Sequence, residues 1–165
     1  MININGMTKL WIISDTHFGK ENSILKRSEN FQQEIIDNWR SLVKDNDTII
    51  HLGDVAEDES GLKVMNGLPG KKILVLGNHD TLAPEIYKEY YGFDEVCKEY
   101  TLNYLDNISS IVPKKILLTH EPRIFHNYYL NIHGHLHNFA TVKSVCKLYL
   151  VALEIQGYRP LEFDD

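Results

Sequence analysis

Five short apolar runs, each ending at a polar tip, dominate the pattern of this 165-residue sequence. The runs are rich in Ile, Leu and Val and are bounded by Gly, Asn or Asp, which is typical of buried strands rather than of helices. The runs with their tips are KLWIIS-DTH (9–17), DTIIHL-GD (47–54), KKILVL-GNHD (71–80), KKILLT-HEP (114–122) and YYLNI-HGHLH (128–137). Such a chain is constrained to a layered sheet structure, and we expect an α/β sandwich with its functional site at one rim.

Helical segments separate the first strands. Residues 28–43 carry an apolar stripe close to the 3.6-residue period, and Ser28 is a candidate N-cap. The stripe comprises Phe31, Ile35, Trp39 and Leu42. Shorter helices are expected at 59–68 and 83–92, so strand and helix alternate through the first half of the chain.

The second half is mostly strand-like. The segments 94–105, 107–112, 114–120 and 147–163 show few helical intervals, and we expect them to form a mixed, mostly antiparallel second sheet packed against the first. No repeat or Pro/Gly-rich linker divides the chain, so residues 1–165 are predicted to form a single domain.

Composition narrows the class of protein. Apolar residues make up 43% and charged residues 24% of the chain, and the net charge is −6, which disfavours a binder of long nucleic acid. Cys97 and Cys146 lie far apart without a CxxC pattern, which favours reduced thiols. The N-terminus lacks a signal-peptide core and no apolar run reaches the roughly 20 residues of a membrane helix, so we expect a cytoplasmic protein with no membrane contact.

The polar tips together offer a set of metal-binding side chains. Imidazoles and carboxylates suit divalent ions such as manganese, iron or zinc, and the absence of cysteine from the set argues against a structural zinc site. So many candidates exceed the needs of one tetrahedral ion and suit two ions that share a bridging carboxylate. The candidates at the tips are Asp15, His17, Asp54, Asn78, His79, Asp80, His120, His135 and His137.

Two such ions favour chemistry at phosphorus. Metal ions roughly 3.5–4 Å apart clamp the attacking and leaving oxygens of an in-line displacement, and a hydroxide held between them is available near neutral pH. Two divalent ions, one hydroxide and the carboxylates of Asp15 and Asp54 leave a net positive charge, which attracts an anionic phosphate ester. His79 is placed to protonate the departing oxygen. Asp80 is a candidate to orient His79 by a hydrogen bond, with a plain turn or capping role as the alternative.

The ordered set DTH, GD, GNHD, H and GHLH resembles the calcineurin-like metallophosphoesterase superfamily over about residues 9–155. The resemblance implies a sandwich of two mixed β-sheets flanked by helices. It implies two divalent metal ions, manganese first, with iron, zinc, nickel or magnesium as alternatives. It makes His79 the catalytic histidine and Asp54 the bridging ligand. The other implied ligands are Asp15, His17 and His137 for the first ion and Asn78, His120 and His135 for the second.

Within this superfamily the sequence is most similar to the small prokaryotic and phage phosphoesterases. The stretch GDVAEDESG (53–61) lacks the arginine of the protein-phosphatase signature, and the chain has no room for the cap domain of the DNA-repair nucleases. Lys20, Arg27 and Arg123 lie near motifs and are candidate phosphate contacts, with ordinary solvated or ion-paired roles as the alternative. His133, in the HGHLH run, is expected to be packed or to support a ligand rather than to be one.

The predicted function is hydrolysis of a small phosphate ester, either a phosphodiester or a nucleotide, by attack of a metal-bridging hydroxide. A phosphomonoesterase and a short-oligonucleotide nuclease of the same family are alternatives. A non-catalytic scaffold that binds metal and another protein is an alternative from a different class. The expected partner is a small phosphorylated molecule, and the sequence leaves the oligomeric state open.

Overall fold

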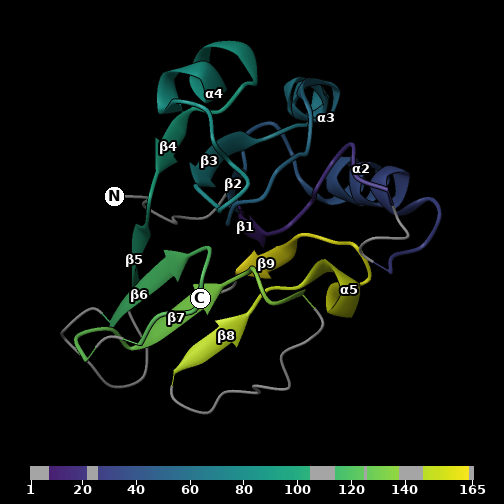
Figure 1. Ribbon diagram of the computed structural model, residues 1–165. Helices are drawn as coiled ribbons and strands as arrows, with labels where there is room; N and C mark the ends of the chain where they lie inside the picture. Colours follow the sequence, from purple (N-terminus) through teal and green to yellow (C-terminus); the bar gives the residue numbers. More distant parts are fainter. Residues whose placement is uncertain (1–7, 22–25, 105–113, 125, 138–146, 164–165) are drawn as a thin grey trace.

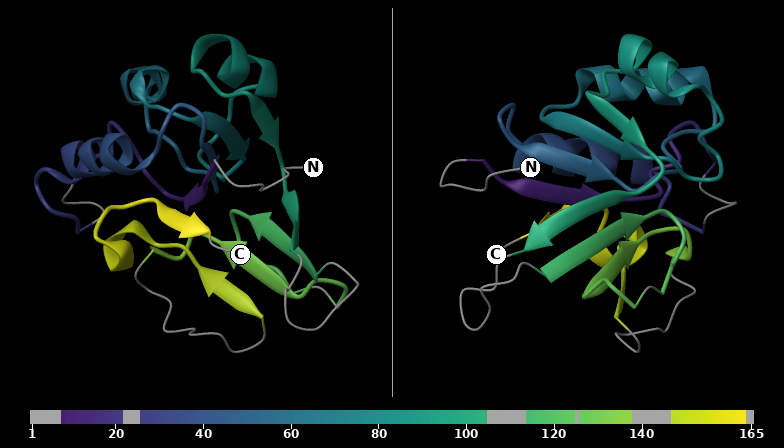
Figure 2. Two further views of the ribbon diagram at one scale, coloured as in Figure 1. Left: turned by 180° about the vertical axis from the view of Figure 1, so that it is seen from behind. Right: turned by 90° about the vertical axis from the view of Figure 1, so that its left-hand side faces the viewer.

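Two β-sheets organise the protein, for which the computed structural model describes residues 8–21, 26–104, 114–124, 126–137 and 147–163 (Figure 1). The strand order is β4-β3-β2-β1-β9 in the first sheet and β5-β6-β7-β8 in the second. Figure 2 shows from two further directions that the sheets are stacked, with helices above the first sheet. The predicted α/β sandwich of two mixed sheets flanked by helices is therefore confirmed.

The first sheet combines strands from both ends of the chain. Strands β1 to β4 pair in parallel, and β9 pairs antiparallel with β1. Its strands are β1 (Leu10–Ile13), β2 (Thr48–His51), β3 (Lys71–Val75), β4 (Glu95–Cys97) and β9 (Leu161–Phe163). The first three occupy the first three predicted runs, which confirms those strand assignments.

The second sheet corrects one expectation. Its strands are β5 (Tyr100–Tyr104), β6 (Lys114–Thr119), β7 (Leu130–His133) and β8 (Leu148–Leu150). Only β5 and β6 pair antiparallel, whereas β6–β7 and β7–β8 are parallel, so the predicted mostly antiparallel sheet is wrong. Parallel pairing lets β6 and β7 present their histidine-bearing carboxyl ends at one edge. The strand expected at 107–112 lies outside the described residues.

The segment 147–163 also divides differently from the expectation. It forms β8, the one-turn helix α5 (Leu153–Gln156) and β9, and β9 joins the first sheet rather than the second. Gly157 ends α5 in the left-handed conformation, with φ 63°, which glycine adopts without strain. The high apolar content of residues 147–163 therefore gave no indication of helix α5 or of the pairing of β9 with the first sheet.

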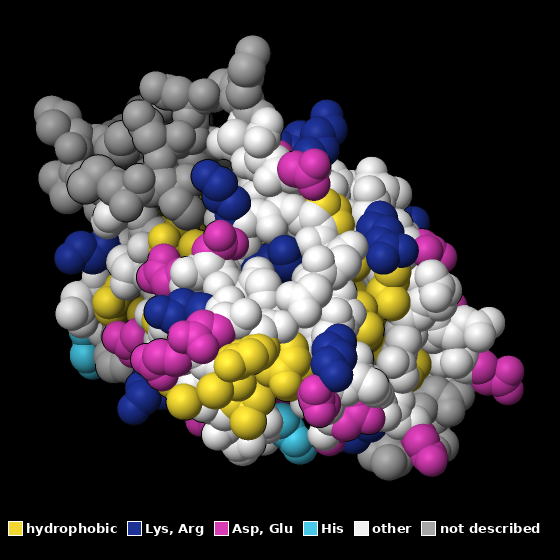
Figure 3. Space-filling model, turned by 90° about the horizontal axis from the view of Figure 1, so that it is seen from above, with side chains coloured by type: hydrophobic (Ala, Val, Ile, Leu, Met, Phe, Trp, Pro, Cys, Tyr) yellow, Lys and Arg dark blue, Asp and Glu magenta, His cyan; other side chains and the backbone are white. Residues whose placement is uncertain are grey.

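Three helices cover the outer face of the first sheet. They are α2 (Phe31–Leu42), α3 (Glu59–Val64), which continues into the 3-10 turn Met65–Gly67, and α4 (Pro84–Tyr90). The stripe predicted on α2 is borne out, because Phe31, Ile35 and Trp39 are buried. Ser28 is not the N-cap: the helix starts later, after Asn30, and the Ser28 hydroxyl donates instead to Glu34. Figure 3 looks down on this helical face, where charged side chains of both signs surround a hydrophobic patch.

Alternation along the central strands builds two hydrophobic cores. Trp11 and Ile13 of β1 face the helices, in a core that includes Trp39 of α2. Leu10 and Ile12 of the same strand face the second sheet. A strand buried on both faces is apolar at every position, which explains the continuous runs in the sequence.

The parallel strands bring all five polar tips to one rim. Strands β1, β2 and β3 are parallel neighbours, as are β6 and β7, so within each sheet the carboxyl ends lie at one edge.

Among the described residues, no helix is long and apolar enough to cross a membrane.

Candidate metal centre

The tips of β1 and β7 bring three candidate ligands together around one position. Asp15, His17 and His137 each offer an atom to a group whose ligand atoms lie within 4.8 Å of one another. Oδ1 of Asp15 is 3.9 Å from Nε2 of His17 and 3.7 Å from Nε2 of His137. The other oxygen of Asp15 accepts hydrogen bonds from the Ser14 hydroxyl and the His135 backbone amide, which fixes the carboxylate. This first cluster is the set predicted for the first ion.

The second cluster lies at the tips of β2, β3, β6 and β7. Asp54, His120 and His135 form a group within the same 4.8 Å limit. Oδ1 of Asn78 is 2.9 Å from Nε2 of His120 and 3.0 Å from Nδ1 of His135, so the amide oxygen converges with the ring nitrogens. One carboxylate, one amide and two imidazoles form this cluster, as predicted for the second ion.

Asp54 lies between the two clusters. Its Oδ2 is 3.7 Å from Nε2 of His17 in the first cluster and 3.4 Å from Nε2 of His120 in the second. Its Oδ1 accepts a hydrogen bond from the backbone amide of His79. Burial alone would raise the pKa of Asp54, but the hydrogen bond and charge of His120 hold it well below its usual range. The Asp54 carboxylate is therefore ionised, and it lies within reach of both clusters.

Unsatisfied atoms at the first cluster fit a cation. Oδ1 of Asp15 and Nε2 of His17 are buried and have no hydrogen-bond partner within the described part of the chain. Burial raises the pKa of Asp15 and lowers that of His17 to about 4, so that imidazole is neutral at physiological pH and its Nε2 lone pair is free. A buried acceptor pair of this kind is costly unless a cation satisfies it. The residues present therefore fit a divalent ion.

The second cluster favours positive charge by a different route. Burial alone would lower the pKa of His120, but the hydrogen bond of Asp54, with the charges of Asp15 and Asp54, raises it to about 9. A protonated His120 therefore compensates the negative charges of Asp15 and Asp54, which a bound metal ion would otherwise neutralise. Cation binding here displaces that proton, as it does at histidine-containing sites generally.

Three ligand histidines are held by partners on their other nitrogen. Nδ1 of His17 donates to Glu57 at 2.7 Å, and Nδ1 of His137 faces Glu154 at 3.1 Å. Nδ1 of His120 donates to the Leu52 carbonyl at 2.8 Å. Such partners fix the tautomer and leave Nε2 aimed at the metal position.

His79 lies beside the first cluster and faces solvent. Its ring packs edge-on against His17, with centroids 5.3 Å apart, and its side chain is 41% exposed. Nδ1 of His79 is 3.7 Å from Oε1 of Glu57, which also accepts a hydrogen bond from Lys20. His79 can therefore reach a bound substrate, and Lys20 lies within the same group of charges.

Of the two roles expected for Asp80, its contacts fit the turn or capping role. Its carboxylate accepts hydrogen bonds from the backbone amides of Asp54, Val55 and Gly77, at 2.8, 3.1 and 2.8 Å. In the described residues, no hydrogen bond joins it to His79. Asp80 instead ties the loop after β2 to the loop after β3, and so places both metal-binding tips.

The backbone at the site is strained in a consistent way. Five of the eight described non-glycine residues with positive φ are metal-site residues, with φ between 46° and 67°. They are Asp15, His17, Asp54, His135 and His137. Left-handed conformations of this kind persist where surrounding structure enforces them and concentrate at functional sites.

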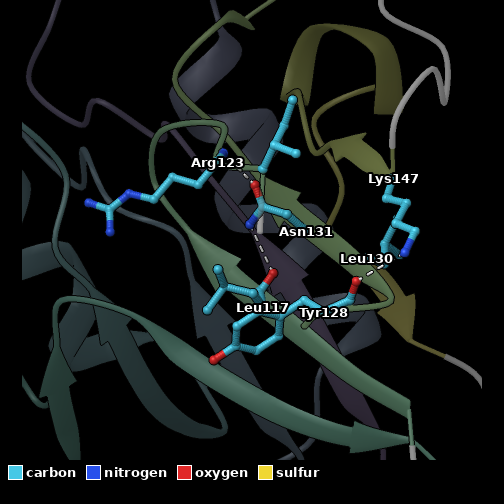
Figure 4. Close-up of a pocket in the computed structure, with 7 residues that line it drawn as sticks. Leu117, Arg123, Tyr128, Leu130, Asn131 and Lys147 are labelled. Carbon is cyan, nitrogen blue, oxygen red and sulfur yellow. Dashed lines mark hydrogen bonds between the residues drawn. The ribbon is translucent and has the colours of Figure 1, made fainter. Parts of the chain in front are cut away.

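Two of the three candidate phosphate contacts are engaged in ion pairs with other residues. The Arg27 side chain is fully buried, binds Glu154 at 2.8 Å and donates to the carbonyls of Asp15 and Thr16, so its guanidinium cannot meet a substrate. Arg123 pairs with Glu99 at 3.3 Å and helps to line the small pocket of Figure 4, whose lining contains none of the metal-site residues. Of the three, Lys20 is the one that belongs to the group of charges beside His79.

Sequence reasoning missed the two carboxylates behind the histidines. Glu57 was not among the candidates, yet it contacts His17, Lys20 and His79. Its position three residues after Asp54 was the available signal. Glu154 carried no local signal, since it meets His137 only through the fold. His133, as expected, is buried outside both clusters, and its Nδ1 donates to the Gly134 carbonyl.

Comparisons with known proteins agree with this arrangement. A family model described as calcineurin-like phosphoesterase matches residues 8–156. MJ1445 of Methanocaldococcus jannaschii, an uncharacterized protein, is 27% identical over 179 residues, which is 96% of this chain and 89% of that protein.

Two solved structures show the same architecture. The Aquifex aeolicus protein AQ665, of unknown function, superimposes with a TM-score of 0.73 at 30% identity, over 94% of this chain and 95% of that one. A novel archaeal phosphodiesterase superimposes with a TM-score of 0.54 at 18% identity, over 94% of this chain and 99% of that one, and this likeness concerns the fold.

Proposed function

Because this chain belongs to the calcineurin-like phosphoesterase family, we propose that it is a dinuclear metal-dependent hydrolase of small phosphate esters, with phosphodiesters as its preferred class. The observation that carries the proposal is the position of Asp54, whose Oδ2 lies within 3.7 Å of a ligand nitrogen of each cluster. The archaeal phosphodiesterase of the same fold makes a diester the first class to test.

The donor set supports two ions rather than one. Asp15, His17 and His137 would hold the first, Asn78, His120 and His135 the second, and Asp54 both. Nitrogen and oxygen donors without sulfur suit manganese, with iron or zinc next. When bound, the two ions would supply Lewis-acid chemistry, by holding the phosphate oxygens and lowering the pKa of a water molecule.

The chain's own residues complete the proposed reaction. Asp15 and Asp54 are the carboxylates among the ligands, so two divalent ions leave the site positive and attractive to a phosphate ester. His79, exposed beside the first cluster, donates a proton to the leaving oxygen. Glu57 accepts a hydrogen bond from Nδ1 of His17 and lies near Nδ1 of His79. This one carboxylate therefore orients the metal ligand His17 and stabilises the protonated form of the general acid His79.

A chromogenic assay tests the proposal. Protein stripped with a chelator should hydrolyse bis(p-nitrophenyl) phosphate only after manganese is restored, and faster than p-nitrophenyl phosphate. His79→Gln should lower kcat by about 10²–10⁴-fold, the usual contribution of a general acid. His126→Gln, at an exposed loop histidine, is the matched control and should leave kcat unchanged.

The same assay distinguishes the alternatives. Faster turnover of the monoester would favour a phosphomonoesterase, and faster turnover of short oligonucleotides a nuclease. No bound metal and no manganese-stimulated turnover would favour a protein-interaction scaffold. Unchanged turnover in Asp54→Asn or His79→Gln would overturn the proposed mechanism.

A further inference from the structure

A cavity of about 330 Å³ opens beside His79. We call it the His79 pocket. It lies between the loop that follows β2, the start of α3, the loop that follows His79, and α4. Its lining comprises Ala56, Glu57, Asp58, Glu59, Leu62, His79, Thr81, Leu82, Tyr87 and Tyr91. The volume is at the lower end of the range for small-molecule sites, about 300–1,000 Å³.

One wall of the pocket is apolar and firmly packed. Tyr87 and Tyr91 are nearly buried, and their rings are 6.3 Å apart. Tyr87 also packs edge-on against Phe93, with centroids 6.1 Å apart. Leu62 is buried, whereas Leu82 is 39% exposed and presents apolar surface to a ligand. Aromatic and aliphatic surface of this kind favours an aromatic or aliphatic group.

Another part of the lining is acidic. Glu57, Asp58 and Glu59 line the pocket, and none of its described lining residues is Lys or Arg. Two nearby lysines offset part of this charge, because Lys20 pairs with Glu57 and Lys63 with Glu59. Three acids against two lysines leave the wall negative.

His79 belongs to both the metal centre and the pocket. Its backbone amide binds the shared Asp54, its ring packs on His17, and its side chain lines the pocket. A phosphate held at the clusters, with its leaving oxygen at His79, therefore directs its leaving group toward the pocket. An anionic leaving group there would be repelled by Glu57, Asp58 and Glu59, whereas an uncharged or cationic group would not be repelled.

We propose, on the basis of the proposed function, that the His79 pocket is the leaving-group subsite and selects an uncharged or cationic leaving alcohol with an aromatic or aliphatic body. Esters whose leaving group carries a further phosphate or a carboxylate are disfavoured. The substrate class is thus a compact phosphodiester rather than a nucleotide chain or a pyrophosphorylated nucleotide.

Binding of free leaving groups tests the subsite without turnover. Two phenols of equal size serve as probes, 4-hydroxybenzylamine as the cation and 4-hydroxybenzoate as the anion, titrated into chelator-treated protein and followed by NMR. The amine should shift the methyl resonances of Leu62 and Leu82 and bind at least about tenfold more tightly than the acid, since like charges oppose binding. Equal affinities, or shifts confined to other residues, would overturn the subsite.

A charge reversal supplies the second arm. Glu59→Lys should narrow or invert the preference for the amine, while Glu89→Lys, on the exposed part of α4, should preserve it. In the manganese-loaded enzyme, methyl aryl phosphates of the same two phenols should show the same order in kcat/KM. Binding with the predicted preference but no turnover of any diester would overturn the proposed function alone, whereas turnover with no charge preference would overturn the subsite alone.

Discussion

Glu154 and His137 meet across the fold, with Oε1 of the carboxylate 3.1 Å from Nδ1 of the imidazole. The same oxygen accepts from Arg27 at 2.8 Å, and Arg27 in turn donates to the backbone carbonyls of Asp15 and Thr16. The short helix α5 thus reaches the first metal cluster through one buried ion pair. Segments from both ends of the chain fix the position of His137.

Removal of Glu154 should therefore weaken metal binding. Glu154→Ala removes the carboxylate that contacts Nδ1 of His137 and pairs with Arg27, and we expect a loss of roughly 10–100-fold in affinity for one of two manganese ions. Glu154→Gln keeps an acceptor for Nδ1 and should lose less. Isothermal titration with manganese measures both sites, with Glu89→Gln as the exposed control. Equal affinities in Glu154→Ala and the native protein would contradict the positioning role.

Asp80 should stabilise the fold as well as the site. Asp80→Asn loses one acceptor oxygen and faces its new amide toward the backbone donors of Asp54, Val55 or Gly77. An unsatisfied buried donor costs about 1–3 kcal/mol, so the free energy of unfolding should fall by that amount. Urea denaturation in the presence of a chelator separates this effect from metal binding. Asp45→Asn, at an exposed position, should be neutral, and a neutral Asp80→Asn would refute the interpretation.

Gly134 should tolerate no side chain. A Cβ at this position would lie 1.8 Å from the Ser14 hydroxyl oxygen and 2.4 Å from Oδ2 of Asp15. Gly134→Ala must therefore displace Asp15 or the loop that carries His135, with an expected loss of about 1–3 kcal/mol in stability and weaker binding of one manganese ion. Gly67→Ala is the control, because its Cβ would meet only Arg40, at 3.5 Å. Similar melting temperatures and metal affinities for the two variants would count against this packing constraint.

Asp47 should make stability depend on pH far from the site. Burial would raise the pKa of its carboxyl, but hydrogen bonds from the amides of Lys44 and Lys9 and from the Trp11 indole hold it below the ordinary 3.8. A depressed folded-state pKa adds stability above the unfolded value and loses it as the pH falls through the folded value. The stability gap between the native protein and Asp47→Asn should be constant from about pH 7 to about pH 5 and shrink below about pH 4. Chemical denaturation in a chelator measures the gap, and a gap that widens on acidification would contradict the assignment.

The strands and most ligands were predictable because they are local features of the sequence. Runs such as KLWIIS and KKILVL are buried on both faces, so continuous apolarity marks them, and each polar tip follows its strand directly. Parallel pairing then places Asp15, Asp54 and Asn78 at one edge without further information.

What the sequence concealed depends on contacts between distant segments. Arg27 and Glu154 pair across 127 positions of the sequence, and no local pattern indicates that the two residues meet behind His137. The sequence left two roles open for Asp80, since its position next to His79 does not show that its carboxylate accepts from three backbone amides. The direction of β7 and β8, and the transfer of β9 to the first sheet, likewise follow from long-range packing.

Anomalous scattering from crystals grown with manganese tests the central claim most directly, namely that two ions share Asp54. We predict two peaks roughly 3.5–4 Å apart, one against Asp15, His17 and His137 and the other against Asn78, His120 and His135, with the Asp54 carboxylate contacting both. A single peak, or peaks away from Asp54, would contradict the dinuclear site.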